Sequence, residues 1–348
     1  MLGFSNRLRA DDDDTAFFSF QNDGKSLSIF DGNLLVLKFN YAFLDHTNVP
    51  KDEPRRFAGD YIYPLNGIHG ENLLDDAPED HFHHHGVFWT WPRVLVYEND
   101  SSTKFFDLWT SNTLIRQRFL NFNKVEFINN CAVVDVENGW FIGRGAIIPD
   151  EELDPSKLGE KIVDNEKYYG EKIVEENVCL IVHPISEFEG VKFRAIDFKL
   201  SLTPTKKDIS LQGAEHKSYG GLTIRFRPEG EIGITRFITT DEGIAKGDMP
   251  LKNLRWADYT SKFFEGELKS GEQCLSGAAI FLAPNFPSFP PTWLTRYYGP
   301  LCVGFPGVIG HRLKTGKTII MEARIWIHGG LVSKELLKKA YEKYFSEK

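Results

Sequence analysis

One short stretch decides the fold class of this 348-residue chain: residues 194–202, with the sequence RAIDFKLSL. Its even positions from 196 onward are apolar, namely Ile196, Phe198, Leu200 and Leu202, whereas its odd positions are mostly polar or small. Successive side chains of a β-strand point to opposite faces, so this alternation is typical of a strand with one face on a core. We therefore predict a half-buried strand here.

The same pattern extends through most of the chain. Residues 222–227 and 321–328 alternate in the same way, and turn-forming Gly, Asn, Asp and Pro separate these segments from other apolar runs. Those further runs predict strands at 27–30, 34–39, 94–98, 113–119, 125–136, 177–183 and 277–282. Helical patterns do not alternate with them, which favours an all-β fold, a large antiparallel two-sheet β-sandwich.

The last residues of the chain follow a different period. Apolar residues recur at helical spacing from about 333 to 346, and Ser333 is suited to cap the first turn of a helix. We predict a C-terminal helix whose apolar stripe packs on the sandwich. The charged segment 150–169 is interpreted as an exposed loop or hairpin extension. The chain is then one β-sandwich domain, 1–348, with its core at 20–330.

The composition excludes several classes of partner. The chain is 41% hydrophobic and 26% charged, with a formal net charge of −8, so nothing attracts it to nucleic acid or to an anionic membrane surface. No apolar run approaches the roughly 18 residues needed to span a bilayer, and residues 1–14 lack the apolar core of a signal peptide. We expect a cytoplasmic protein with no membrane or nucleic-acid partner, and the oligomeric state stays open.

Chemistry is concentrated in residues 78–91, PEDHFHHHGVFWTW. Four of the ten histidines lie at 81–85, beside an aspartate and two tryptophans. Histidine is the side chain whose ordinary pKa lies closest to neutrality. Such a cluster favours proton transfer, metal binding or sugar binding, although single histidines of this kind are also common as hydrogen-bonded turn residues.

Two arrangements of this cluster remain open. In an extended segment His81, His83 and His85 would share one face and could bind a divalent metal, with a further ligand from a remote residue. Alternatively, Asp80 orients a neighbouring imidazole that acts as a general acid or base. We favour the second arrangement, expect no cofactor, and assign His83, Asp80 and His81 as catalytic residues.

Two further segments supply candidate ligand-binding residues. Residues 215–226 carry Lys217 and Arg225, which could clamp an anionic or carbonyl oxygen, unless they lie on a solvated sheet face. Residues 284–299 are rich in proline and aromatics and predict a rigid loop, in which Trp293, Arg296 and Tyr297 would suit a sugar ring. With His84 added, we predict that these residues converge on one cleft.

These motifs occur in a fixed order along the chain: Tyr63-Pro64-Leu65; Asp80, His81, His83, His84, Gly86 and Trp91; Tyr219 to Leu222 with Arg225-Phe226; Gly277 to Phe281; Asn285, Pro287, Pro290, Trp293 and Arg296; and Arg324 with His328. The series resembles the family often labelled methane oxygenase subunit, or PmoA-like. Two positions depart from its pattern: His85 stands where the family usually has another residue, and no Asp-His-Pro step occurs at Leu282-Ala283.

The resemblance implies a two-sheet sandwich related to the galactose-mutarotase supersandwich, with a sugar or sugar derivative bound in a groove on one sheet. Membrane methane oxidation, which the label implies, does not suit a chain without a transmembrane segment. We predict a carbohydrate-active enzyme of the epimerase, mutarotase, lyase or hydrolase type that uses acid–base chemistry. The alternatives are a non-catalytic carbohydrate-binding or sensing protein, and a metal-dependent hydrolase or oxygenase that uses the histidine cluster.

Overall fold

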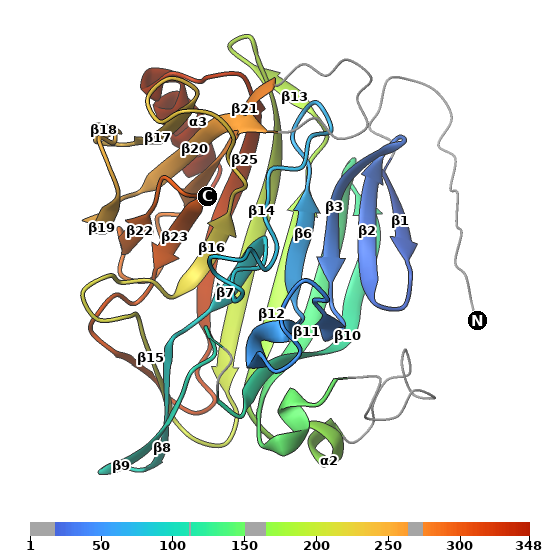
Figure 1. Ribbon diagram of the computed structural model, residues 1–348, viewed down its shortest axis with the longest axis vertical. Coiled ribbons are helices and arrows are strands. Elements are labelled where there is room, and N and C mark those ends of the chain that lie inside the picture. The colour runs from blue at the N-terminus through green and yellow to red at the C-terminus, as the bar shows by residue number, and fades with distance from the viewer. Residues whose placement is uncertain (1–17, 111–112, 150–164, 264–273) are drawn as a thin grey trace.

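Two antiparallel β-sheets pack face to face in the computed structural model, which describes residues 18–110, 113–149, 165–263 and 274–348 (Figure 1). The nine strands described for the first sheet are, in spatial order, β1 (Phe18–Asn22), β2 (Ser26–Asp31), β3 (Leu34–Asn40), β6 (Tyr61–Leu65), β7 (Val87–Thr90), β16 (Gly221–Arg225), β23 (Pro300–Gly304), β22 (Thr292–Thr295) and β19 (Met249–Asn253). We call it the site sheet.

The second sheet, which we call the back sheet, has ten strands among the described residues. Its order is β10 (Ile115–Ile128), β11 (Cys131–Ile142), β12 (Glu171–Val182), β14 (Val191–Pro204), β25 (Ile319–Gly329), β21 (Cys274–Leu282), β20 (Trp256–Phe263), β17 (Arg236–Thr240) and β18 (Gly243–Ile244), and β13 (Ser186–Phe188) pairs with β14. Two smaller sheets consist of β24 (His311–Leu313), β15 (Ile209–Gln212), β8 (Arg93–Asn99) and β9 (Ser102–Phe106), and of β4 (Leu44–Asp45) and β5 (Phe57–Ala58).

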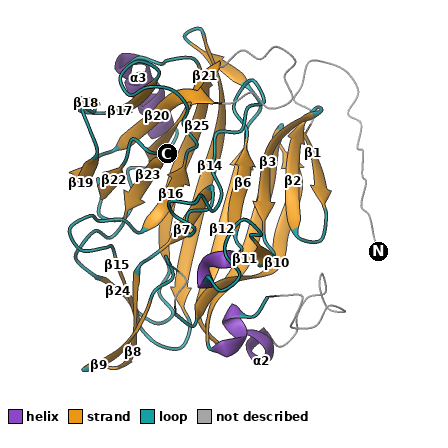
Figure 2. Ribbon diagram, viewed as in Figure 1, coloured by secondary structure: helices purple, strands orange, loops and turns teal. Residues whose placement is uncertain are grey.

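The helices are few and short apart from the last one (Figure 2). They are η1 (Pro54–Arg56), η2 (Arg144–Ile147), α2 (Asn165–Tyr169) and α3 (Lys334–Ser346). None of the helices in the described ranges is long and apolar enough to cross a membrane. The predicted all-β sandwich with a C-terminal helix is confirmed. Of the predicted loop at 150–169, residues 150–164 lie outside the described residues, and the rest forms α2.

Two local predictions are wrong for identifiable reasons. Residues 125–136 are not one strand, because Asn129 and Asn130 adopt φ angles of 50° and 61° and form the turn between β10 and β11. Asparagine tolerates this left-handed conformation better than most residues, and two such residues in a row suit a tight hairpin. Residues 284–299 are also not all loop, because 292–295 form strand β22.

The inner faces of both sheets supply one apolar core. The alternation predicted from the sequence places Leu222, Ile224 and Phe226 of the site sheet in this core, together with Ile196 and Phe198 of the back sheet. On the outer side of the back sheet, α3 covers a second cluster that includes Trp256, Phe281 and Trp326. Ser333 caps α3 by accepting a hydrogen bond from the Leu336 amide, as predicted.

A carboxyl group lies at the centre of this core. Glu176 of β12 is fully buried and accepts hydrogen bonds from Trp89 and Asn138 at 2.9 Å, from Gln117 at 3.0 Å and from Trp140 at 2.7 Å. Trp89 belongs to the site sheet, whereas the other three donors belong to the back sheet. Glu176 therefore joins the two sheets with polar contacts inside an otherwise apolar interface.

We predict that Glu176→Gln destabilises the protein by at least about 2 kcal/mol, because an amide nitrogen would face N–H donors and leave buried groups unsatisfied at about 1–3 kcal/mol each. The free energy of unfolding from denaturant titration measures this. Glu175→Gln is the matched control, since Glu175 is a half-buried neighbour whose carboxylate makes no hydrogen bond or ion pair among the described residues. Equal stability of the two variants would contradict the role assigned to Glu176.

Candidate functional site

The candidate site lies on the outer face of the site sheet. Strand alternation turns Phe88, Leu294 and Cys302 away from the core, and these residues form a separate apolar cluster with Tyr61 and Trp109. Strands β16, β23 and β22 are neighbours, and Cys302 is paired in register with both Thr223 and Leu294. This small cluster is the floor on which the polar site residues rest.

The histidine segment is a compact turn, not an extended strand. The His81 amide donates to the Pro78 carbonyl at 2.9 Å, and the His84 amide donates to the His81 carbonyl at 3.0 Å. The turn ends at Gly86, whose φ is 55° and where a Cβ atom would lie 2.1 Å from the Ile62 carbonyl oxygen. Only glycine fits that position without displacement of β6.

This turn brings three imidazoles together and separates the fourth. The rings of His81 and His84 stack with centroids 4.6 Å apart, and the His83 ring meets the His84 ring edge-on at 4.6 Å. His85 points elsewhere and its Nδ1 lies 2.8 Å from Asp76 Oδ1. The predicted face of His81, His83 and His85 is therefore wrong, since it assumed extended backbone.

Arg225 anchors the turn to the sheet. Its guanidinium donates to both oxygens of Asp80, at 2.9 and 3.1 Å, and to the Tyr298 carbonyl at 3.0 Å. Asp80 Oδ2 also lies 2.9 Å from His81 Nδ1. Burial acts to raise the pKa of Asp80, but the nearby His81 and Arg225 outweigh it and hold that pKa below its usual value. Asp80 is thus beside His81, and Arg225 is occupied by Asp80 instead of facing a ligand.

A cavity of about 180 Å³ opens between this turn and the sheet floor. Segments far apart in the sequence contribute its walls. Its lining residues are His81, His83, His84, Trp109, Thr110, Lys217, Tyr219, Thr223, Leu294, Arg296, Tyr298, Pro300 and Cys302. We call it the histidine pocket. Of the predicted site residues, it brings together His81, His83, His84, Lys217 and Arg296.

The imidazoles in the pocket have unused hydrogen-bonding capacity. Among the described residues, neither Nδ1 of His83 nor Nδ1 of His84 has a hydrogen-bond partner, although both atoms are buried. Burial, followed by the positive charges of His81 and Arg55, lowers the pKa of His83 to about 3. Burial likewise lowers the pKa of His84. Both rings are therefore neutral near pH 7, and each has one ring nitrogen that can accept a hydrogen bond.

Two of the predicted sugar-contacting residues face the core instead. Trp293 is fully buried, and its indole N–H donates to the Leu254 carbonyl at 2.8 Å. Tyr297 is also buried, and its hydroxyl donates to the Ala245 carbonyl at 2.7 Å. The prediction failed because β22 alternates: Leu294, not Trp293, is on the pocket side. Arg296 does line the pocket, while its guanidinium donates to Asp248 at 2.9 Å.

The aromatic faces of the pocket come from residues not chosen from the sequence. Tyr298 stacks on His81 with centroids 5.2 Å apart, and it lies only one residue beyond the predicted Tyr297. Trp109 contacts the rings of both His83 and His84, at 6.3 and 5.9 Å between centroids. The alternation of side chains along β22, continued beyond its end, places Leu294, Arg296 and Tyr298 on the pocket side, so the sequence contained a signal for Tyr298. No local sequence pattern marked Trp109, which follows β9.

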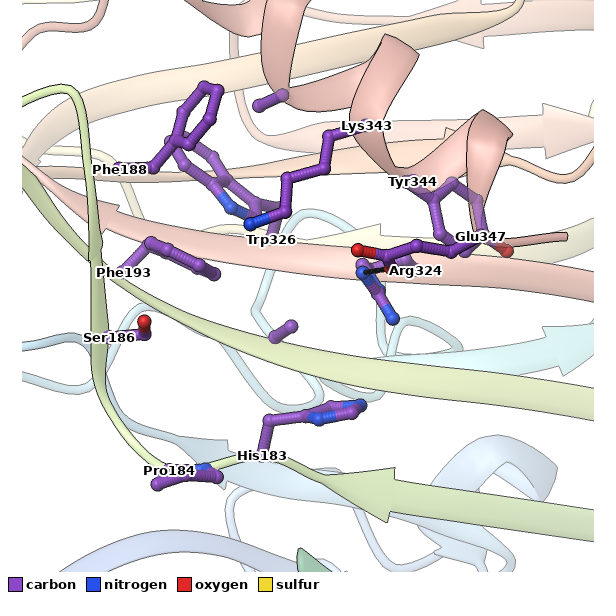
Figure 3. A pocket seen from close by; sticks show the side chains of 12 residues that line it. His183, Pro184, Ser186, Phe188, Phe193, Arg324, Trp326, Lys343, Tyr344 and Glu347 are labelled. Carbon is purple, nitrogen blue, oxygen red and sulfur yellow. Dashed lines mark hydrogen bonds and ion pairs between the residues drawn. The ribbon is translucent and has the colours of Figure 1, made fainter.

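A larger cavity of about 290 Å³ lies on the outer face of the back sheet, under α3 (Figure 3). Three of its ionisable groups are already paired: Arg324 binds Asp197 at 2.7 and 3.0 Å and Glu347 at 2.8 Å, and His183 also binds Asp197 at 2.9 Å. The remaining basic group, Lys343, lies over the Phe188 ring. The histidine pocket is smaller, but two of its imidazoles, His83 and His84, have Nδ1 atoms without a partner among the described residues, so we take it as the candidate site.

Comparison with protein families gives one match, which covers residues 27–342 and is described as a family of unknown function, DUF6807. The chain belongs to this family. The match does not support the PmoA-like label that the motif series resembles, so that finer label remains a prediction. No curated protein matches the DUF6807 chain.

Two solved structures are similar to this DUF6807 protein at a low level. A polysaccharide lyase shares 9% identity at a TM-score of 0.30, and the alignment covers 78% of this chain but only 31% of the lyase. A galactose 1-epimerase from Lactobacillus acidophilus NCFM shares 10% identity at a TM-score of 0.35, covering 93% of this chain and 98% of the epimerase. Likenesses this weak carry no argument about the site.

The placement of Trp293 gives a prediction opposite to the one from its sequence context. Trp293→Ala should destabilise the protein by about 3–5 kcal/mol, as large-to-small core substitutions do. Arg296→Ala should change stability by less than about 1 kcal/mol, because its ion pair is partly exposed. Denaturant unfolding of both variants measures this. A stable Trp293→Ala variant would show that the indole is not a core side chain.

Proposed function

We propose that the histidine pocket binds a sugar or sugar derivative and catalyses acid–base chemistry on it, of the epimerase, mutarotase, lyase or hydrolase type. One observation carries the proposal: His83 and His84, whose buried Nδ1 atoms have no hydrogen-bond partner among the described residues, line a cavity that also holds Lys217 and Arg296. Buried polar atoms without partners are rare in folded proteins, so two of them on residues that line one cavity favour a ligand-binding role for that cavity.

The other lining residues favour a small polyhydroxylated ligand. Trp109, Tyr219 and Tyr298 offer aromatic surfaces for the C–H face of a sugar, and the two cationic side chains can donate to hydroxyl, carbonyl or carboxylate oxygens. The cavity of about 180 Å³ is smaller than the roughly 300–1,000 Å³ of pockets for drug-sized ligands. One sugar unit is therefore the expected occupant.

Within this proposal His83 is the proton carrier. Its pKa of about 3 keeps the ring neutral at pH 7, with a lone pair that can accept a hydrogen bond from a ligand hydroxyl. The proton transfer proposed here requires the bound ligand to raise that pKa towards neutrality. His81, held beside Asp80, is the second proton-transfer group, and its ring centroid lies 5.6 Å from that of His83. Arg225 has a positioning role, because it holds Asp80 and hence the turn.

We predict that His83→Ala lowers turnover by roughly a hundredfold or more, as expected for the loss of a general acid or base, while the fold is retained. The substrate is first found by incubating the protein with a panel of neutral and acidic monosaccharides and following their conversion by NMR. His311→Ala is the matched control, because His311 is exposed and lies outside the pocket. Full activity of His83→Ala on that substrate would show that His83 is not the proton carrier.

Lys217→Ala should act differently. Because Lys217 is proposed to contact ligand oxygens but not to carry the proton, its loss should raise KM with a smaller effect on kcat. Steady-state kinetics of this variant beside His83→Ala separates the two roles. A kcat loss in Lys217→Ala as large as that in His83→Ala would contradict this division.

The second candidate is a non-catalytic sugar-binding protein on the same scaffold. It is favoured by the pairing of Arg225 and Arg296 with carboxylates, which leaves few free charges for catalysis. Under this alternative a sugar raises the melting temperature, and Tyr298→Ala abolishes that rise, but NMR detects no conversion at any protein concentration.

A further inference from the structure

A second group of ionisable side chains lies behind the histidine turn and is not used by the proposed reaction. Asp76 Oδ1 is 2.8 Å from His85 Nδ1, and Asp76 Oδ2 is 3.2 Å from His46 Nε2. The Tyr61 hydroxyl lies 3.0 Å from His46 Nε2 and 3.1 Å from Asp76 Oδ2. Of the clusters in the described ranges, this is the one whose ligand atoms all lie close enough to hold a metal ion.

The protonation of His46 follows from its other contact. His46 Nδ1 is 3.1 Å from the Arg56 carbonyl oxygen, which can only accept a hydrogen bond, so Nδ1 carries a hydrogen. In the neutral ring, Nε2 then has a lone pair directed at a carboxylate oxygen. That contact is repulsive unless a positive charge lies between the two atoms, either an extra proton on His46 or a metal cation.

The distances suit a cation. A tetrahedral ion with bonds of about 2.0–2.2 Å to nitrogen and oxygen separates neighbouring ligand atoms by roughly 3.3–3.6 Å. The separations here are 2.8 Å from Asp76 Oδ1 to His85 Nδ1 and 3.2 Å from Asp76 Oδ2 to His46 Nε2, so each imidazole lies beside a different carboxylate oxygen. One ligand atom from each of the three residues lies within 4.8 Å of the other two. A small movement of the side chains would admit an ion. The Arg56 carbonyl would fix the His46 ring from outside, as a hydrogen bond to the far nitrogen does in many metal sites.

A cavity next to this cluster has room for a non-protein ligand. It has a volume of about 40 Å³ and is lined by Tyr61 and His85, and also by His83 and Trp109, which line the histidine pocket as well. The volume exceeds the roughly 10–15 Å³ that one water molecule needs. Three protein ligands and one water are the usual set at a catalytic zinc site.

We propose that His46, Asp76 and His85 bind one divalent transition-metal ion such as Zn²⁺, with a water molecule in the adjoining cavity and Tyr61 hydrogen-bonded to Asp76. This site differs from the face of His81, His83 and His85 that the sequence indicated, and it shares only His85 with it. The proposal does not depend on the sugar chemistry, since metal binding is measured without a substrate.

The test uses the full chain, treated with a chelator and then titrated with Co²⁺ and with Zn²⁺. Wild-type protein should bind one equivalent, show the visible absorption bands of low-symmetry Co²⁺, and melt at a higher temperature with Zn²⁺. Asp76→Asn and His46→Gln, which keep side-chain size, should lose the stoichiometric ion and the absorption bands. His83→Ala and His311→Ala should bind as wild type does, because neither residue is a ligand.

Circular dichroism and a melting curve show whether the two ligand variants are folded. If both variants fail to fold, His85→Asn is measured in the same way, and the titration of the wild-type protein still tests whether one ion binds.

If the wild-type protein does not bind one equivalent of metal, the cluster is an ion pair in which His46 carries an extra proton, and the proposal is wrong. Loss of the ion in His83→Ala with retention in Asp76→Asn would place the metal in the histidine pocket and overturn the proposal. A loss of sugar turnover with metal binding intact would count only against the proposed reaction.

Discussion

The carboxyl group of Glu176 receives four hydrogen bonds inside the core, and the positions of the other layers follow from that contact. Burial raises the pKa of this group, and the four donors act in the opposite direction. A buried acid is costly unless every lone pair is used. Because one donor, Trp89, comes from the site sheet, satisfying the acid fixes β7 against the back sheet, and β7 begins directly after the histidine turn.

The turn is held at its other end by a second polar contact. Arg225 of β16 binds Asp80 and the Tyr298 carbonyl, so one guanidinium links the histidine turn, the site sheet and the β22–β23 connection. The positions of the three pocket imidazoles therefore depend on two buried polar groups, Glu176 and Arg225, one on each side of the turn. Neither group lines the histidine pocket, so both act by placing the residues that do.

Sequence periodicity was sufficient for the layers but not for every side chain. Alternation at 194–202 and 222–227 predicts both the strands and their inward faces correctly, because one buried face imposes period two. The predicted direction of the Trp293 side chain is wrong, because the proline-rich context indicated a loop and the alternation of a four-residue strand was not recognised. The predicted direction of the His85 side chain is also wrong, because side chains in a turn do not alternate with a fixed period. His46 and Asp76 are 30 residues apart, and no local pattern joins them.

The floor and the core are built from the same short strands. Phe88 belongs to the apolar floor cluster and its neighbour Trp89 donates to Glu176, just as Leu294 faces the histidine pocket and Trp293 fills the core. Any change that shifts the register of β7 or β22 by one residue would exchange these faces. Redesign of ligand preference therefore has little freedom on the floor. The rim residues Lys217 and Tyr298, which lie on connections outside the strands, are the positions where new specificity can be introduced without unfolding the sandwich.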